Sequence, residues 1–164
     1  LCDLAGLECI IVKGKSKRGN GSVGHAWNLI MVDGEYYHLD VTNDDPVTAN
    51  GYDALAYYYF NLPDWEMSLS NEWDASEYPS CTSTENSYYY KNRLVADNRE
   101  DFGEAVQRAL EQRKEMIELK VTDYSEDRYS NISDILFELG NVRKYSYSVL
   151  KELGIIRIFN IQYS

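Results

Sequence analysis

The chain has 164 residues, which is long enough for one sizeable hydrophobic core, or for one core with a small appended unit. Its formal net charge of -11 and its isoelectric point near 4.6 argue against binding to nucleic acid or to anionic membranes, because both need a basic patch. No apolar stretch is long enough to span a bilayer, so we expect no membrane insertion.

The first part of the chain predicts a small sheet. Residues 1–6 resemble the last turn of a helix that ends at Gly6. The apolar run 7–16 predicts a strand, and the polar residues 17–22 predict a loop. Residues 23–42 then predict a β-hairpin, because Asp33-Gly34 stands between two alternating apolar runs.

The hairpin turn also predicts a register. A two-residue turn at Asp33-Gly34 places Val32 opposite Glu35. Counting back along both strands, His25 lies opposite Thr42 and Asp40 lies opposite Trp27. His25 and Asp40 are then diagonal neighbours on one face, about 7 to 8 Å apart between backbones.

This placement lets the Asp40 carboxylate accept a hydrogen bond from the His25 imidazole, which is half of a nucleophilic catalytic triad. His38 lies on the same face, two residues before Asp40, and is a rival partner that the register alone does not separate from His25. A metal site in this segment would recruit His25, His38, Asp40, Asp44 and Asp45. Their spacing matches no known ligand signature, and Asp44-Asp45 is typical of a turn after a strand. We therefore expect neither a metal nor a cofactor.

The three cysteines are weak candidates for the nucleophile. Cys2 lies near a predicted helix C-terminus, which disfavours a thiolate, and Cys9 lies in an apolar run typical of a buried strand. Cys81 lies in a polar loop from which it could approach His25. An odd number of cysteines without regular spacing predicts no disulfide framework and no zinc site.

The middle of the chain predicts irregular structure around one more strand. Residues 43–54 form a turn-rich connection, and the Tyr-rich run 55–62 predicts a strand. Trp65, Trp73 and Tyr78 follow in chain without a clear pattern. These aromatic side chains either pack a long loop onto the sheet or form a wall of a substrate cleft, and we favour packing.

The character of the sequence changes from residue 99 onwards. Apolar spacing predicts a helix over 100–114 and another over 130–139 that stops at Gly140, with a strand over 116–121 between them. Residues 141–153 predict a third helix that ends at Gly154, and 155–163 alternate like a strand. We therefore expect a core over residues 1–98 and a small α/β extension over 99–164.

One segment resembles a known family. The residues that carry the resemblance are Gly24-His25-Ala26-Trp27-Asn28, Asp33-Gly34, Tyr36-Tyr37-His38-Leu39-Asp40-Val41-Thr42 and Asp44-Asp45-Pro46. Their order and spacing resemble the bacterial transglutaminase-like family of papain-like cysteine enzymes. The resemblance also covers residues 1–14, where residues 5–14 resemble the strand that follows the cysteine-bearing helix of that family, and it covers residues 58–90 more weakly.

The resemblance implies an α+β fold, with a transglutaminase-like, papain-like antiparallel sheet core before the α/β appendage. It implies His25 and Asp40 as catalytic residues in thioester acyl transfer or amide hydrolysis on a protein or peptide substrate. In that family the nucleophilic cysteine precedes the segment that starts this chain, so we expect residues 1–164 to be inactive alone.

The alternative is a noncatalytic protein-binding module that retains the fold. The absence of the preceding helix would leave an apolar face, where we expect self-association. A secreted or cell-surface bacterial protein is slightly favoured.

Overall fold

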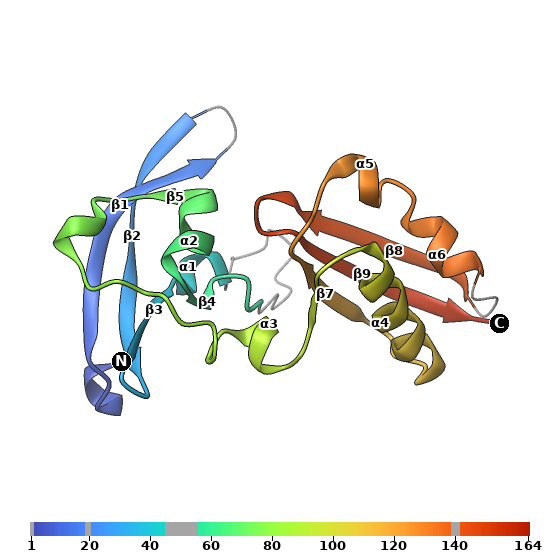
Figure 1. The fold of residues 1–164 in the computed structure, drawn as a ribbon, viewed down its shortest axis with the longest axis horizontal. Coiled ribbons are helices and arrows are strands. Elements are labelled where there is room, and N and C mark those ends of the chain that lie inside the picture. The colour runs from blue at the N-terminus through green and yellow to red at the C-terminus, as the bar shows by residue number, and fades with distance from the viewer. Residues whose placement is uncertain (1, 19–20, 45–55, 139–141) are drawn as a thin grey trace. The chain divides into compact units, whose positions relative to one another are not determined.

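The computed structural model describes residues 2–18, 21–44, 56–138 and 142–164. The chain divides into two compact units, Leu1–Asn92 and Arg93–Ser164, where the sequence predicted a boundary between residues 98 and 99. Each unit is built around its own sheet and carries helices (Figure 1). The fold is thus mixed α+β, as predicted at this level.

The first unit contains a five-stranded sheet in the order β4-β3-β2-β1-β5, in which every neighbouring pair is antiparallel. Its two longest strands, β1 and β2, extend beyond the rest of the sheet (Figure 1). The strand bounds are β1 Cys9–Arg18, β2 Gly21–Val32, β3 Glu35–Leu39, β4 Phe60–Leu62 and β5 Asn71–Glu72.

The predicted hairpin register is confirmed for the paired residues. Val32 pairs with Glu35, and the ladder continues in that register to Asn28 and Leu39. Asp33 and Gly34 both have positive φ, at 53° and 84°, as a two-residue turn of this kind requires.

The predicted end of the hairpin at Thr42 is wrong, and so is the pairing of Thr42 with His25. Strand β3 stops at Leu39, and helix α1 (Val41–Asp44) begins two residues later. The Asp40 Oδ1 accepts a hydrogen bond from the backbone N–H of Asn43 at 3.3 Å, in the manner of a helix N-cap. Helix capping by Asp40 therefore replaces further strand pairing.

Two other predictions for this unit need correction. The predicted strand over 55–62 is confined to Phe60–Leu62, with Leu55 outside the described residues. Trp65 lies in helix α2 (Asp64–Ser70), which begins directly after Pro63 and turns Met67 and Ser70 toward the core. The short helices of the unit are η1 Asp3–Ala5, α1 Val41–Asp44, α2 Asp64–Ser70, η2 Ala75–Glu77 and α3 Tyr88–Lys91.

The second unit has a four-stranded sheet in the order β6-β7-β9-β8, in which only the β6–β7 pair is parallel. The predicted helices over 100–114 and 130–139 and the predicted strand over 116–121 are confirmed with shifted ends, although Leu139 and Gly140 lie outside the described residues. The elements are β6 Val95–Ala96, α4 Arg99–Glu111, β7 Ile117–Val121, α5 Glu126–Tyr129, α6 Ile132–Glu138, β8 Val142–Leu150, η3 Lys151–Leu153 and β9 Ile155–Tyr163.

The predicted helix over 141–153 is wrong, because Val142–Leu150 forms strand β8. This segment is rich in Tyr, Ser and Val, which are weak helix formers, and it pairs antiparallel with β9. Gly154 is the predicted stop, with a φ of 63°, but the element that it ends is the short η3 turn.

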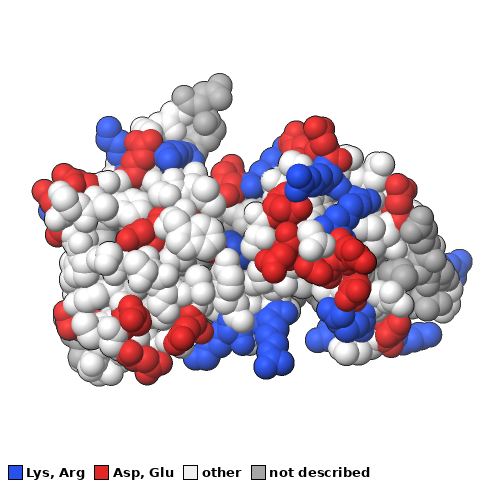
Figure 2. Space-filling model, viewed as in Figure 1, with Lys and Arg blue, Asp and Glu red and all other residues white. Residues whose placement is uncertain are grey.

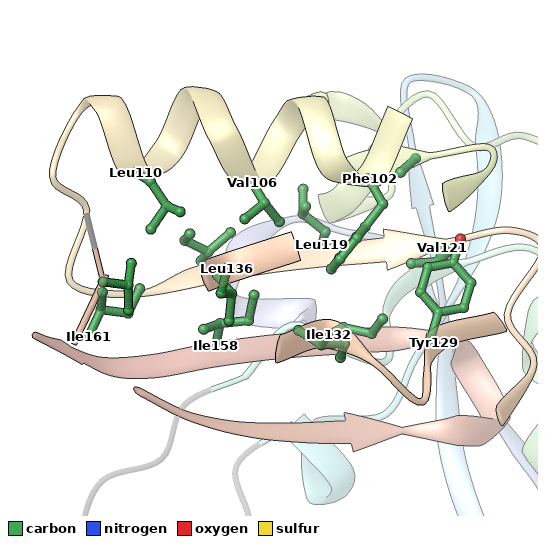
Figure 3. Close-up of a cluster of buried hydrophobic side chains, with 14 residues drawn as sticks. Phe102, Val106, Leu110, Leu119, Val121, Tyr129, Ile132, Leu136, Ile158 and Ile161 are labelled. Carbon is green, nitrogen blue, oxygen red and sulfur yellow. The ribbon is translucent and has the colours of Figure 1, made fainter. Parts of the chain in front are cut away.

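The core of the second unit lies between its helices and its sheet. Phe102, Val106 and Leu110 project from one side of α4 toward the sheet (Figure 3), and all three are buried. Leu136 from α6 joins the same cluster, together with Ile158 from β9. These three residues of α4 are four positions apart, which is the helical spacing that predicted this helix from the sequence.

Acidic and basic side chains are interspersed with uncharged ones on the face drawn in Figure 2. Within the part of the chain that the structure describes, no helix is both long and apolar enough to cross a bilayer.

Gly14 in β1 generates a prediction about the sheet. A Cβ atom there would lie 2.3 Å from the Glu72 carbonyl oxygen and 2.7 Å from the Trp27 ring. We expect Gly14→Ala to destabilise the first unit by about 1 to 3 kcal/mol, because β5 and Trp27 would have to move. All three tryptophans, residues 27, 65 and 73, lie in this unit, so urea unfolding followed by tryptophan fluorescence reports on it.

Gly24→Ala is the matched control, because a Cβ atom at Gly24, in the neighbouring strand, meets nothing within 4 Å. Equal unfolding midpoints for Gly14→Ala and Gly24→Ala would contradict the prediction.

Candidate active site

The structure brings the side chains of His25 and Asp40 together. The His25 Nε2 lies 2.6 Å from the Asp40 Oδ2, a short, charge-assisted hydrogen-bond distance. The Asp40 side chain is 1% exposed, whereas that of His25 is 18% exposed. Because Nε2 donates to the carboxylate, Nδ1 is the nitrogen of His25 that is left to accept a proton.

Asp40 is held from several sides. The side-chain amide Nδ2 of Asn43 donates to the same Oδ2 at 2.6 Å. The backbone N–H of Asp40 donates to the Tyr59 carbonyl next to β4 at 3.2 Å. A carboxylate fixed in this way holds the imidazole in one orientation.

Trp27 provides a platform for His25. The two rings are stacked, with centroids 5.8 Å apart and planes at 26°. Gly14 pairs with His25 across the β1–β2 ladder, and the Trp27 ring lies close above the Cα of Gly14.

The rival histidine, His38, has different partners. Its Nδ1 accepts a hydrogen bond from the Trp27 Nε1–H at 2.8 Å, and its Nε2 lies 2.8 Å from the Asp64 Oδ1. Since the indole can only donate, the His38 proton must be on Nε2, where it is donated to Asp64. Burial lowers the pKa of His38, against the opposing effect of Asp64. His38 is therefore a neutral, buried linker between β3 and α2.

Among the described residues, one group of His, Cys and Asp side chains has the proximity of a metal site. The ligand atoms of His38, Asp64 and Cys81 lie within 4.8 Å of one another. A metal would need the lone pair of His38 Nε2, yet the bond from Trp27 leaves the imidazole proton on that nitrogen. The cluster is arranged for hydrogen bonding. The five residues considered as a metal set do not come together: His25 bonds to Asp40, and His38 bonds to Asp64. The Asp44 carboxylate accepts from the Tyr59 backbone, and Asp45 lies outside the described residues.

The cysteines of the described chain have poor settings for a nucleophile. Cys81 is 1% exposed, and burial raises the pKa of its thiol to about 12. Its backbone N–H donates to the Asp64 carboxylate, and its sulfur contacts the Pro79 carbonyl.

Cys9 is a strand residue as predicted, but it is only half-buried. It pairs with Ile30 at the far end of the ladder from the Gly14–His25 pair, about 17 Å away at about 3.4 Å per residue. Cys2 precedes this strand, next to the η1 turn.

Three residues of the site could not be assigned from the sequence. The sequence places Asn43 in a turn-rich connection and indicates no role for Asp64. Trp73 is one of three aromatic residues that the sequence predicts to pack onto the sheet or to line a cleft. The Trp73 ring packs edge-on against Trp27 at 5.7 Å and against His38 at 4.7 Å. The Asp40-x-x-Asn43 spacing is a signal that could have identified Asn43, because a helix N-cap reaches its N3 residue.

No known protein-family model matches the chain, and no curated protein matches its sequence significantly. The interpretation of the site therefore depends on its geometry.

Asp44, at the end of α1, is a buried acid next to this site. It is 5% exposed, and its Oδ1 accepts the backbone N–H of Tyr59 at 2.7 Å. Its Oδ2 has no hydrogen-bond partner among the described residues. Burial raises the pKa of Asp44 to about 7, and the charge of Asp40 adds to the increase.

This pKa predicts how Asp44→Asn changes stability with pH. The folded protein retains the Asp44 proton up to a higher pH than the unfolded chain, so the wild type loses stability as the pH rises from 3.8 to about 7. Asparagine retains the acceptor for Tyr59 and has no proton to lose. We expect Asp44→Asn to be more stable than the wild type by about 1 to 3 kcal/mol at pH 8, with the advantage shrinking toward pH 4.

Urea unfolding followed by tryptophan fluorescence at both pH values measures the difference. An advantage of equal size at pH 4 and pH 8 would show that the carboxyl does not titrate as described.

Proposed function

We propose that the first unit belongs to a transglutaminase-like cysteine enzyme that acts on protein or peptide amides by thioester acyl transfer or hydrolysis. The observation that carries this proposal is the 2.6 Å contact between His25 Nε2 and the buried Asp40 carboxylate, with His25 partly open to solvent. The resemblance of residues 24–46 to that family supports it. A His–Asp pair of this kind is the acid–base half of a nucleophilic triad.

In this proposal the thiolate comes from outside residues 1–164. His25 Nδ1 takes the proton of the attacking cysteine, and Asp40 stabilises the resulting imidazolium. The thiolate adds to the amide carbonyl, and the imidazolium then gives its proton to the leaving amine as the C–N bond breaks. Water or a second amine attacks the thioester carbonyl, loses a proton to His25 and releases the cysteine.

The test uses the parent protein expressed from its complete gene. We expect His25→Gln to lower amide hydrolysis or acyl transfer by about 100-fold or more, which is the usual contribution of a general base. The assay measures ammonia or amine release from a casein substrate, with and without an added primary amine. Unchanged thermal unfolding would show that the loss is chemical.

Ser22→Ala is the matched control, because Ser22 is an exposed residue on the same strand. Full activity of His25→Gln would contradict the proposal, and so would a wild-type parent protein that shows no reaction with casein.

A second candidate function is a noncatalytic protein-binding module, favoured by exposed apolar side chains near the N-terminus. Leu4 is 90% exposed and Ile11 is 62% exposed, although both are large hydrophobic residues. Exposed apolar surface commonly marks an interaction site. For this function we propose self-association of the chain through Leu4 and Ile11.

We expect sedimentation velocity to show concentration-dependent association that Leu4→Ser and Ile11→Ser together abolish. A monomer at all concentrations would contradict self-association. Val23→Ser is the control, because Val23 is equally exposed, at 63%, on the neighbouring strand.

A further inference from the structure

A pocket in the first unit lies between helix α2 and the end of the sheet. Its volume is about 470 Å³, within the range of ligand-binding pockets. Two tryptophans dominate its lining, Trp65 from α2 and Trp73 just after β5. Trp65 is 52% exposed, so it does not act as a core residue.

Trp73 connects this pocket to the candidate active site. Its ring packs edge-on against Trp27, the platform of His25, and against His38. Asp64, which also lines the pocket, accepts the hydrogen bond from His38. One wall of the pocket is thus fixed by the buried network, while Trp65 on α2 has an exposed ring.

Most polar groups in the pocket already have partners. Lys17 Nζ donates to the Ser68 carbonyl at 2.9 Å and lies 3.8 Å from the Glu72 carboxylate. The Ser68 hydroxyl donates to the Trp65 carbonyl. The two Asp64 carboxylate oxygens accept from His38 and from the backbone of Cys81.

Asn71 is different, because it retains an unused donor. The residue is 1% exposed, and its Oδ1 accepts a hydrogen bond from the Ser70 hydroxyl at 2.9 Å. Its Nδ2 has no acceptor among the described residues. Asn71 pairs with Ser16 in β1, and Ser16 pairs with Val23 in β2, so Asn71 lies on the same sheet face as His25.

A buried amide donor without an acceptor costs about 1 to 3 kcal/mol, and a ligand carbonyl would remove this cost. The Nδ2 atom is itself covered, so the hydrogen bond to a ligand carbonyl requires a local rearrangement that opens the pocket toward it. Trp65, which lines the pocket, is exposed, and exposed side chains change rotamer within nanoseconds.

We propose that this pocket binds a peptide segment through an aromatic side chain, which packs against Trp65 and Trp73, while Asn71 Nδ2 donates to a carbonyl of the same segment. Aromatic rings that meet stacked or edge-on gain about 0.5 to 1.5 kcal/mol beyond burial of their area. The carboxylates of Asp64 and Glu72 line the pocket and disfavour an anionic ligand. This inference is independent of the acyl-transfer chemistry.

A sugar ring could also stack on Trp65, but it fits the polar groups less well. A sugar carries several hydroxyl groups that each need a partner when buried. In this pocket the polar side chains of Lys17, Ser68 and Asp64 are already engaged with protein groups. One free donor beside two indole rings suits a single carbonyl next to an aromatic group.

The test is an NMR titration of the full chain that follows the indole N–H signals of Trp65 and Trp73. The probes are N-acetyl-phenylalanine amide, N-acetyl-alanine amide and the disaccharide cellobiose. We expect saturable shifts of both indole signals with the phenylalanine amide, and much weaker shifts with the alanine amide and with cellobiose.

Three variants test the assignment of residues. Trp65→Ala should abolish saturation, and Leu69→Ala, its control on α2, should bind like the wild type because Leu69 is similarly exposed, at 49%, but does not line the pocket. Asn71→Leu should weaken binding by about 2- to 10-fold through the lost hydrogen bond. Because Trp65 is exposed, Trp65→Ala remains informative if Asn71→Leu does not fold.

The proposal would be overturned by the absence of saturable shifts with the phenylalanine amide, or by tighter binding of cellobiose. Unchanged binding in Trp65→Ala would also overturn it. Wild-type affinity in a folded Asn71→Leu variant would rule out the hydrogen bond to the carbonyl.

Discussion

The hydrogen bond from the Trp27 indole N–H to His38 Nδ1 is the constraint on which the first unit depends. An indole nitrogen can only donate, so this bond places the single proton of a neutral imidazole on Nε2. That proton is then donated to Asp64 at the start of α2, and the other oxygen of Asp64 accepts the backbone N–H of Cys81. Two strands, a helix and a loop are thereby joined through one buried histidine.

The same bond fixes Trp27, which contacts both the candidate catalytic histidine, His25, and the pocket residue Trp73. The His25 ring stacks on Trp27 and is hydrogen-bonded to the buried Asp40 carboxylate. Trp73 packs against Trp27 with the two rings nearly perpendicular, and it forms a wall of the aromatic pocket. The candidate catalytic pair and the proposed peptide-binding pocket thus share a rigid aromatic centre, which is the kind of support that preorganised sites need.

Much of this arrangement could be predicted from the sequence, because local turn chemistry determines it. The Asp33-Gly34 turn predicted the register of the β2–β3 ladder, and His25 and Asp40 are in contact as predicted, although Asp40 lies just beyond the paired residues. The His38 partners could not be predicted, because Asp64 lies 26 positions away in the sequence. The segment 142–150 forms a strand and not the predicted helix, because its Tyr and Val residues favour a strand and it pairs with the next strand, β9, across the short η3 turn.

The most direct test of this account is the tautomeric state of the two histidines, measured by long-range proton–nitrogen NMR at neutral pH. A His25→Gln variant assigns the signals, since the chain has only two histidines. We expect His38 to be neutral, with its proton on Nε2 and an unprotonated Nδ1 that accepts from Trp27. A proton on His38 Nδ1, in either the other neutral tautomer or a doubly protonated ring, would contradict this account.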